Sequence, residues 1–184
     1  MRIIGGSLRG RTFSAPEGML TRPTGDRVRE ALFNILFGRV QGTTVLDGFA
    51  GSGALSFEAL SRGAASATLF DVDAGAAQTL RRNAAALGLS GRCDIRSADF
   101  LQGAPALHGQ GFGLVFLDPP YAAGLLDRSL ELVGRHGLLS PGGIVVAEHS
   151  ANAVLPGELA GLAAFDRRRY GIAALTLYKR QDDA

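Results

Sequence analysis

From residue 42 onward, short apolar segments rich in β-branched residues alternate with segments of helical periodicity. This alternation is typical of a parallel sheet covered by helices. We expect strands at residues 43–47, 67–71, 93–97, 114–118 and 144–148, and four of these five segments end on a carboxylate. Because ligands of open α/β sheets bind at the carboxyl ends of the strands, the pattern predicts a binding site at that edge.

Helices are expected between the strands. Residues 54–62 and 74–87 are followed by Gly63 and Gly88, and glycine readily takes the left-handed conformation that ends a helix. Four apolar residues mark a third helix: Leu125, Leu126, Leu130 and Val133.

The two ends of the chain have simpler patterns. Ahead of the core, apolar residues at helical spacing follow Thr24, which we expect to be a helix N-cap. Residues 163–170 and 173–179 flank Gly171 and predict an antiparallel hairpin. The first twenty residues are expected to form a small hairpin or arm.

The net charge of +2 is unevenly distributed along the chain. Residues 1–39 carry a net charge of +4, residues 40–165 carry −4, and residues 166–184 carry +2. Basic ends around an acidic middle favour termini that face a polyanion; the alternative is a surface that is only solvated. The N-terminal arginines that we expect to contact the polyanion are Arg2, Arg9, Arg11, Arg22, Arg27 and Arg29.

A single cysteine, Cys93, and a start without a long apolar run predict a cytoplasmic protein with no disulfide framework, no secretory signal and no membrane span. The three histidines are widely separated and no Cys/His cluster is present, so no metal site is expected.

A glycine-bearing turn follows the first strand, in the sequence Val-Leu-Asp-Gly-Phe-Ala-Gly-Ser-Gly at residues 45–53. Glycines let the backbone approach a ligand, and the next helix begins with unpaired N–H groups. The glycine spacing differs from that of a dinucleotide fingerprint and suits a nucleoside cofactor without a pyrophosphate; the alternative is a tight turn without a ligand.

Carboxylates after the second and third strands are candidates for the same cofactor. Asp71 lies about twenty residues beyond the glycines, where a carboxylate can accept both ribose hydroxyls, and Asp73 is expected to start the next helix. Asp99 is a candidate acceptor for an adenine amino group, with Phe100 beside the base. A solvated carboxylate at Asp71 and a loop-capping role for Asp99 are the alternatives.

The most specific motif is Asp118-Pro119-Pro120-Tyr121, directly after an apolar strand. Two prolines fix the backbone and have no N–H, so a carboxylate and a free carbonyl can be aimed at one target. Such a pair can accept both hydrogens of an exocyclic amino group of a base and free its lone pair, while the tyrosine ring stacks on the base. The alternative is a turn that only ends the strand.

Taken together, these motifs resemble class I methyltransferases and, over nearly the whole chain, the RsmD family of bacterial 16S rRNA guanine-N2 methyltransferases. The resemblance includes an arginine-rich start with the pair Gly5-Gly6, the block at residues 22–34, the glycine loop with its helix at residues 49–64, and the tetrapeptide at residues 118–121.

The resemblance implies a Rossmann-like α/β fold with a seven-stranded, mostly parallel sheet of order 3-2-1-4-5-7-6 and helices on both faces. It implies one methyltransferase domain, residues 1–184, with a basic extension at 1–40 and a catalytic core at 41–184. S-adenosyl-L-methionine is the implied cofactor. The implied partner is 16S rRNA, in the small ribosomal subunit or in its assembly intermediate. We expect the protein to be a monomer. The cofactor residues would be Thr24, Asp47, Phe49, Ala50, Gly51, Ser52, Gly53, Asp71, Val72, Asp99 and Phe100.

Three residues depart from the family's common pattern. Gly48 stands where Leu is common, Ser56 where Gly is common, and Asp71 where Glu is frequent. We expect the first two to loosen local packing and the third to shorten the reach to the ribose.

Two other functions use the same features. An adenine-N6 nucleic-acid methyltransferase shares the tetrapeptide, and a non-catalytic RNA-binding assembly factor needs only the basic ends. A nicotinamide-dependent reductase is disfavoured by the glycine spacing. Guanine N2 as the acceptor is implied by the family resemblance alone.

Overall fold

The computed structural model describes residues 1–16, 23–120 and 124–183, and the chain divides into two compact units, Met1–Ala98 and Asp99–Ala184. Arg22 and Tyr121, two of the predicted site residues, lie outside the described residues, as does the side chain of Thr24. The single catalytic domain with a boundary near residue 40 stays a prediction.

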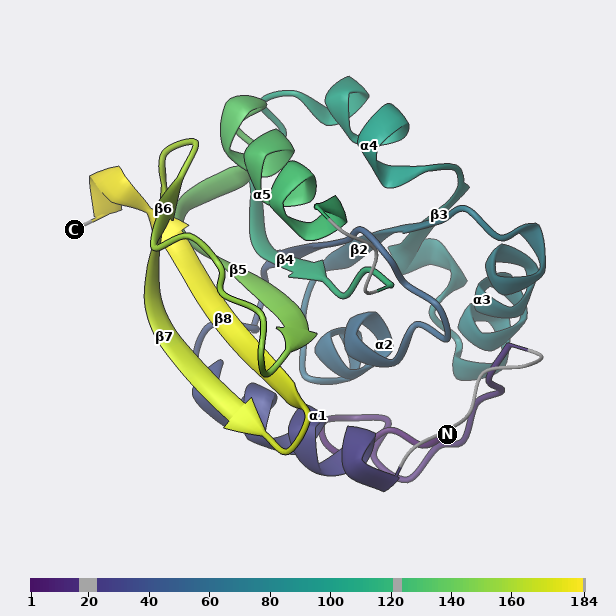
Figure 1. Cartoon of the computed structure of the whole chain (residues 1–184). Helices are drawn as coiled ribbons and strands as arrows, with labels where there is room; N and C mark the ends of the chain where they lie inside the picture. Colours follow the sequence, from purple (N-terminus) through teal and green to yellow (C-terminus); the bar gives the residue numbers. More distant parts are fainter. Residues whose placement is uncertain (17–22, 121–123, 184) are drawn as a thin grey trace. The chain divides into compact units, whose positions relative to one another are not determined.

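Unit 1 contains a parallel sheet of order β3-β2-β1. Its strands are β1 (Thr44–Asp47), β2 (Ser66–Asp71) and β3 (Cys93–Ser97). They are packed by α2 (Ala54–Ser61) and α3 (Ala74–Leu87) (Figure 1). The strands agree with the predicted segments to within one residue. Each strand is a short buried apolar run, and the glycines that end the neighbouring helices restrict where it can begin.

Helix α1 (Pro23–Ile35) precedes this sheet, and a 3-10 turn (Ser90–Arg92) precedes β3. The helix begins at Pro23, so Thr24 lies inside its first turn and the predicted N-cap at Thr24 is wrong. Proline fits the first turn of a helix because its missing N–H would have no partner there.

The first residues form the small hairpin that the sequence predicted. Arg2 and Thr12 form an antiparallel bridge, and the Ile3 amide donates to the Arg11 carbonyl at 2.9 Å. Gly6 has φ +76°, and a Cβ there would lie 2.0 Å from the carbonyl oxygen of Ser61. Glycine at this position therefore allows the hairpin to approach the end of α2.

Glu58 of α2 holds the hairpin in place. Its side chain is fully buried and accepts hydrogen bonds from the amides of Ile4 and Gly5, each at 2.8 Å. Arg62 Nε donates to the same carboxylate at 2.7 Å, and Arg29 Nε lies 3.7 Å from it. A buried carboxylate is tolerated only when charges and donors of this kind compensate its lost hydration.

Unit 2 contains five strands in the order β4-β5-β8-β7-β6 (Figure 1). The strands are β4 (Phe112–Leu117), β5 (Leu139–Ser150), β6 (Glu158–Leu159), β7 (Leu162–Tyr170) and β8 (Ala173–Arg180). Strand β4 runs parallel to β5, and the remaining pairs are antiparallel. The predicted terminal hairpin around Gly171 is confirmed as β7 and β8.

The helices of unit 2 are α4 (Phe100–Gly103) and α5 (Leu125–Arg135), with short 3-10 segments at Ala104–Leu107 and Gln181–Asp183. Strand β5 begins five residues before the predicted limit of 144, because Pro141, Gly142 and Gly143 interrupt the apolar pattern without ending the strand. Within the described parts of the chain, no helix is long and apolar enough to cross a membrane.

Taken unit by unit, the strands follow the predicted order 3-2-1 and then 4-5-7-6, with β8 and β7 as the predicted strands 7 and 6. The count is eight rather than seven, because the two-residue strand β6 pairs with β7 at the edge. A strand of two residues carries no periodicity that a sequence can display.

The buried network around Glu58 leads to a stability prediction. Glu58→Ala should lower the free energy of unfolding by about 3 to 5 kcal/mol, because it leaves the 4% exposed Arg29 without its buried anion. Glu131→Ala is the matched control, since the pair of Glu131 with Arg135 is 40% and 71% exposed and such pairs contribute about 0 to 1 kcal/mol. Urea unfolding measures both variants, and equal losses would show that Glu58 is not the anchor.

Candidate functional site

The turn between β1 and α2 requires glycine at its last position. Gly53 has φ +81° and is the N-cap of α2, and a Cβ there would lie 2.3 Å from the Phe57 ring. Gly51 has φ +52°. Their conformations fold the turn tightly over the start of α2, at the carboxyl end of β1 where the sequence predicted a ligand.

Asp71, at the end of β2, orders this turn from the side. Its Oδ2 accepts the Gly51 amide at 2.8 Å, and its Oδ1 accepts the Asp73 amide at 2.9 Å. Each carboxylate oxygen can accept a further hydrogen bond, so Asp71 can still bind hydroxyl groups. Beside it, Val72 is 75% exposed, and Asp73 accepts the Ala76 amide at 2.7 Å, which confirms it as the start of α3.

Asp47, at the end of β1, is 3% exposed and hydrogen-bonded within unit 1. Its Oδ2 accepts the Ser56 hydroxyl at 2.7 Å, and its Oδ1 accepts the Phe49 amide at 3.4 Å. Ser56 is fully buried. The expectation that Ser56 loosens local packing is therefore wrong, because its hydroxyl adds a buried hydrogen bond to a carboxylate of the predicted cofactor site.

The remaining cofactor candidates of the turn lie close to these carboxylates in sequence. Ala50 is 8% exposed and its amide donates to the Phe70 carbonyl at 2.9 Å, and Ser52 is 5% exposed. Both contribute mainly backbone to the surface of the turn.

Asp99 is the N-cap of α4 in unit 2, and its Oδ1 accepts the Gln102 amide at 3.1 Å. The capping role that the sequence left open is thus present. Phe100, which follows it, is 2% exposed and belongs to the core. A contact of either residue with an adenine base stays a prediction.

Asp118 and Pro119 follow β4 directly, at the carboxyl end of the strand. Leu117 pairs with Ala147 in the parallel ladder between β4 and β5. The next residues along the two strands, Asp118 and Glu148, therefore occupy matching steps on neighbouring strands, which lie about 4.8 Å apart in a sheet. Glu148 is the carboxylate that ends the fifth predicted strand, and it was not among the predicted site residues.

No described residue balances the negative charges of these two carboxylates. Across residues 1–16, 23–120 and 124–183, neither has a hydrogen-bond donor or a cation as partner. Asp118 remains open to solvent, yet protein atoms around its carboxyl group remove much of its hydration, and this desolvation raises its pKa to about 6. Desolvation, and then the negative charge of Asp118, raises the pKa of Glu148 to about 7.

A cavity of about 250 Å³ opens beside this pair within unit 2. Its walls include Pro119, Pro120, Glu148, Ser150 and Val154. Val154 is 88% exposed and gives the cavity an apolar edge. A volume of this size accommodates a purine base, and its lining combines apolar surface with two carboxylates, the exposed Asp127 and the half-buried Glu148.

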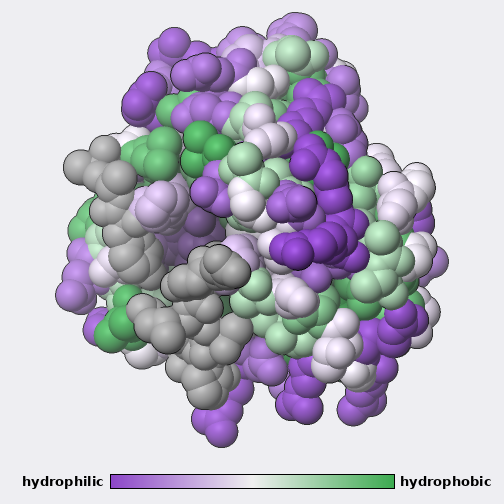
Figure 2. Space-filling view, turned by 90° about the vertical axis from the view of Figure 1, so that its right-hand side faces the viewer, coloured by the Kyte–Doolittle hydropathy of each residue, from purple (hydrophilic) through white to green (hydrophobic). Residues whose placement is uncertain are grey.

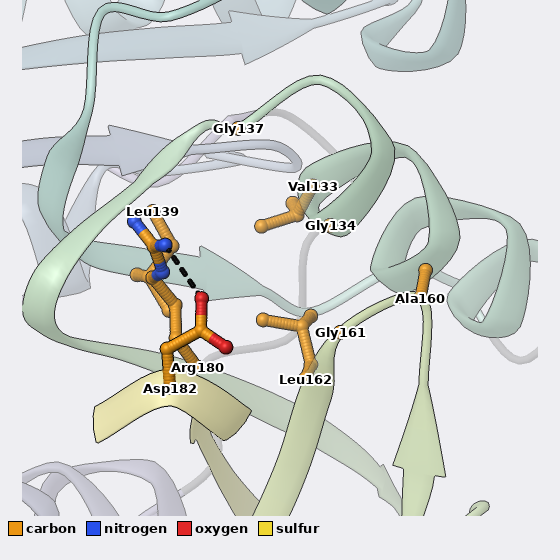
Figure 3. Close-up of a pocket in the computed structure, with 9 residues that line it drawn as sticks. All are labelled: Val133, Gly134, Gly137, Leu139, Ala160, Gly161, Leu162, Arg180 and Asp182. Carbon is orange, nitrogen blue, oxygen red and sulfur yellow. Dashed lines mark hydrogen bonds and ion pairs between the residues drawn. The ribbon is translucent and has the colours of Figure 1, made fainter.

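A second cavity of about 220 Å³ lies at the amino end of β5, around Leu139 (Figure 3). Its charged residues, Arg180 and Asp182, point toward each other, with Arg180 Nη2 3.0 Å from Asp182 Oδ2. Their charges compensate each other, and parallel sheets bind ligands at the opposite ends of their strands. We therefore place the candidate site at the cavity beside Glu148.

The predicted polyanion contacts differ in their accessibility. Arg9, Arg11 and Arg27 are exposed, and Arg2 is 70% exposed although its Nε lies 3.6 Å from Asp26. Hydrophilic residues also gather in patches on the face drawn in Figure 2. Arg29 is the exception: it is 4% exposed and donates to Asp26 at 2.9 Å, so its guanidinium is not accessible to a phosphate.

Comparison with known proteins assigns the family. Residues 1–179 match the family described as conserved hypothetical protein 95. Ribosomal RNA small subunit methyltransferase D of Escherichia coli (strain K12) is 39% identical over 183 residues, which cover 98% of this chain and 90% of that protein. The chain belongs to the RsmD family.

Relatives and solved structures extend this match. The Haemophilus influenzae (strain ATCC 51907 / DSM 11121 / KW20 / Rd) protein of the same name as the E. coli enzyme is 38% identical over 152 residues, covering 80% of this chain and 78% of that protein. The structure of E. coli yhhF has a TM-score of 0.88 at 39% identity and covers 98% of this chain and 97% of that one. Thermus thermophilus TTHA0928 has a TM-score of 0.77 at 35% identity, covering 96% and 98%.

Glu148 is the site residue that sequence reasoning missed in this RsmD-family member. The signal was present, because the fifth predicted strand also ends on a carboxylate. It was not decisive, because only the pairing of β4 with β5 shows that Asp118 and Glu148 are neighbours, and only the folded chain places Glu148 in a cavity wall with Pro119.

The raised pKa of Glu148 predicts a pH-dependent stability. A carboxyl group with a higher pKa in the folded state binds its proton more tightly there, so folding loses stability as the pH rises from about 4.5 to about 7. Glu148→Gln, which cannot ionise, should raise Tm by a few degrees at pH 8, since about 1 kcal/mol corresponds to roughly 2 to 4 °C in a domain of this size. At pH 5 the gain should be much smaller.

Calorimetry at both pH values tests this. Glu158→Gln, at an exposed position of the edge strand β6, is the control and should behave like the wild type at both pH values. A Tm gain of Glu148→Gln that is equal at pH 5 and pH 8 would contradict the assignment.

Proposed function

We propose that this protein transfers a methyl group from S-adenosyl-L-methionine to the exocyclic N2 amino group of a guanine in 16S rRNA. The observation that carries the proposal is the Asp118-Pro119-Pro120 corner at the end of β4, beside a cavity of purine size in unit 2. Membership of the RsmD family supports the reaction class, and the name of the 39% identical relative supports small-subunit rRNA as the substrate.

The residues of unit 1 fit the cofactor. Asp71 has acceptor positions left after binding two amides and can take the ribose hydroxyls. The exposed Val72 offers an apolar surface for the adenine ring. Covering this surface with the ring would favour binding, because it removes apolar area from water. The turn at Gly51 and Gly53 would let the backbone approach the nucleoside. When bound, S-adenosylmethionine supplies an electrophilic methyl group on a sulfonium sulfur.

Asp118 and Pro119 act on the acceptor base. An exocyclic amino group is a weak nucleophile because its lone pair is delocalised into the ring. Hydrogen bonds from its two N–H groups to the Asp118 carboxylate and the Pro119 carbonyl favour a pyramidal nitrogen with an available lone pair. The proline corner is rigid, so both acceptors are positioned before the base arrives, and orientation supplies most of the catalysis.

Asp118 also receives the proton that the amino group must lose. The methylated amine is transiently cationic and strongly acidic, so a strong base is unnecessary. A carboxylate with a pKa of about 6 is ionised at neutral pH and accepts this proton more readily than an ordinary aspartate. The desolvation that raises the pKa therefore assists the step that follows methyl transfer.

The exposed N-terminal arginines Arg2, Arg9, Arg11 and Arg27 are proposed contacts to rRNA phosphates. Such contacts hold the RNA without reading its sequence, which leaves base selection to the cavity of unit 2. The target guanine must leave its stack to enter that cavity.

Asp71→Ala should weaken S-adenosylmethionine binding by about 1.5 to 3 kcal/mol, because a charge-assisted contact to the ribose is lost. Isothermal titration calorimetry measures the affinity. Asp94→Ala is the matched control in the same unit, since the Asp94 side chain is 53% exposed on β3. An affinity of Asp71→Ala equal to that of the control would remove Asp71 from the cofactor site.

Asp118→Ala should lower methyl transfer by at least about a thousandfold while cofactor affinity stays within a few-fold. A substrate RNA with inosine at the target should receive no methyl group from the wild type, because inosine is guanosine without the N2 amino group. Mass spectrometry of RNA nucleosides provides the readout. Turnover of Asp118→Ala within about tenfold of wild type, or about 1.4 kcal/mol, would refute the amino-group mechanism, and methylation of inosine would identify another acceptor atom.

A further inference from the structure

Glu148 occupies a fixed position at the wall of the cavity. It ends the central part of β5, which pairs with β4 on one side and with β8 on the other, where Glu148 lies opposite Leu175. Its neighbour His149 is 3% exposed and bonds Thr176 Oγ1 through Nε2 and the Ser150 carbonyl through Nδ1, both at 2.8 Å. These contacts hold the end of β5 rigidly.

The loop that completes the cavity wall is also held. Arg167 donates to the Ala153 carbonyl at 2.8 Å, and the Tyr178 hydroxyl donates to the Pro156 carbonyl at 2.9 Å. Residues 150 and 153–155 of this segment line the cavity. Hydrogen bonds therefore hold two parts of the wall beside Glu148, the end of β5 and this loop.

A structural role does not account for Glu148. Among the described residues, the two fully buried carboxylates are paired: Glu58 has two arginines and two amides, and Asp47 has a hydroxyl and an amide. Glu148 instead has no donor among the described residues, and it faces the negative charge of Asp118 across adjacent strands. An acid without compensation, at the wall of a cavity, is available for a ligand that brings its own donor.

We propose that Glu148 is the residue that selects guanine, by accepting the hydrogen of ring nitrogen N1 while Asp118 and Pro119 accept those of the N2 amino group. This inference rests on the proposed function. The two donors are adjacent on one edge of guanine, and Asp118 and Glu148 are adjacent on one edge of the sheet.

The same arrangement rejects adenine. Next to its amino group, adenine presents N1 as an acceptor, so an ionised Glu148 would face a lone pair and neither group would find a partner. A site built to hydrogen-bond a donor rejects an analogue that lacks it, because the buried acceptor stays unpaired. The hydrogen bond from N1–H also offsets the repulsion between the two carboxylates. Among the described residues of the free protein, no donor offsets it.

The test compares two substrate RNAs that differ only at the target nucleotide. One carries guanosine and the other carries 2-aminopurine riboside, which keeps the 2-amino group but has no hydrogen on N1 and no oxygen on C6. The wild type should methylate the guanosine RNA at least about tenfold faster, which corresponds to about 1.4 kcal/mol. Glu148→Gln presents an NH₂ that donates to the bare N1 of 2-aminopurine, so its preference should fall to within about threefold or reverse.

Because the missing C6 oxygen affects both enzymes equally, the ratio of the two preferences isolates the contact to N1. If Glu148→Gln turns over too slowly to measure, the same comparison uses the dissociation constants of the two RNAs in the presence of S-adenosylhomocysteine. Glu158→Gln is the control and should keep the wild-type preference.

An unchanged preference for guanosine in Glu148→Gln, with both rates lowered equally, would overturn the inference and leave the proposed function intact. A wild-type enzyme that methylates neither RNA, nor guanine in rRNA from a strain lacking the protein, would overturn both. Calorimetric S-adenosylmethionine affinity equal to wild type verifies that the variant is folded.

Discussion

Parallel pairing of neighbouring strands is the constraint on which the candidate binding residues of each unit depend. In unit 1, β1 and β2 run parallel, with Asp47 paired to Leu69, so that Asp71 emerges at the same edge as the turn it orders. In unit 2, the pairing of Leu117 with Ala147 places Asp118 and Glu148 side by side. Parallel strands expose their last residues together, so acids that are far apart in sequence become neighbours.

The two units treat these acids in opposite ways. In unit 1, the carboxylates of Asp47 and Asp71 accept hydrogen bonds from the turn and from α2, and these bonds fix the backbone that a nucleoside would contact. In unit 2, Asp118 and Glu148 have lost part of their hydration, which raises their pKa values, and no described residue donates a hydrogen bond to either. The first arrangement stabilises the fold, whereas the second costs stability and suits a site whose ligand supplies the missing donors.

The arginines show a similar division between structure and function. Arg29 and Arg62 are used inside unit 1, where they compensate Glu58 and thereby hold the N-terminal hairpin on α2. Arg9, Arg11 and Arg27 are exposed and available to a polyanion. Net charge along the sequence counts all of them alike, so the basic character of residues 1–39 overstates the number of arginines that a polyanion could reach.

The sequence by itself determined the α/β class, the terminal hairpin and the glycine turn, because buried apolar runs and glycines have few alternative conformations, whereas the strand order came from the family resemblance. It also determined the Asp118-Pro119-Pro120 corner, whose rigidity is local. Only the tertiary structure decided the partners: that Ser56 donates to Asp47, that Arg29 is buried against Glu58, and that Glu148 stands beside Asp118 at a cavity. Burial and charge compensation depend on which strands and helices meet, and those meetings join residues that no local pattern connects.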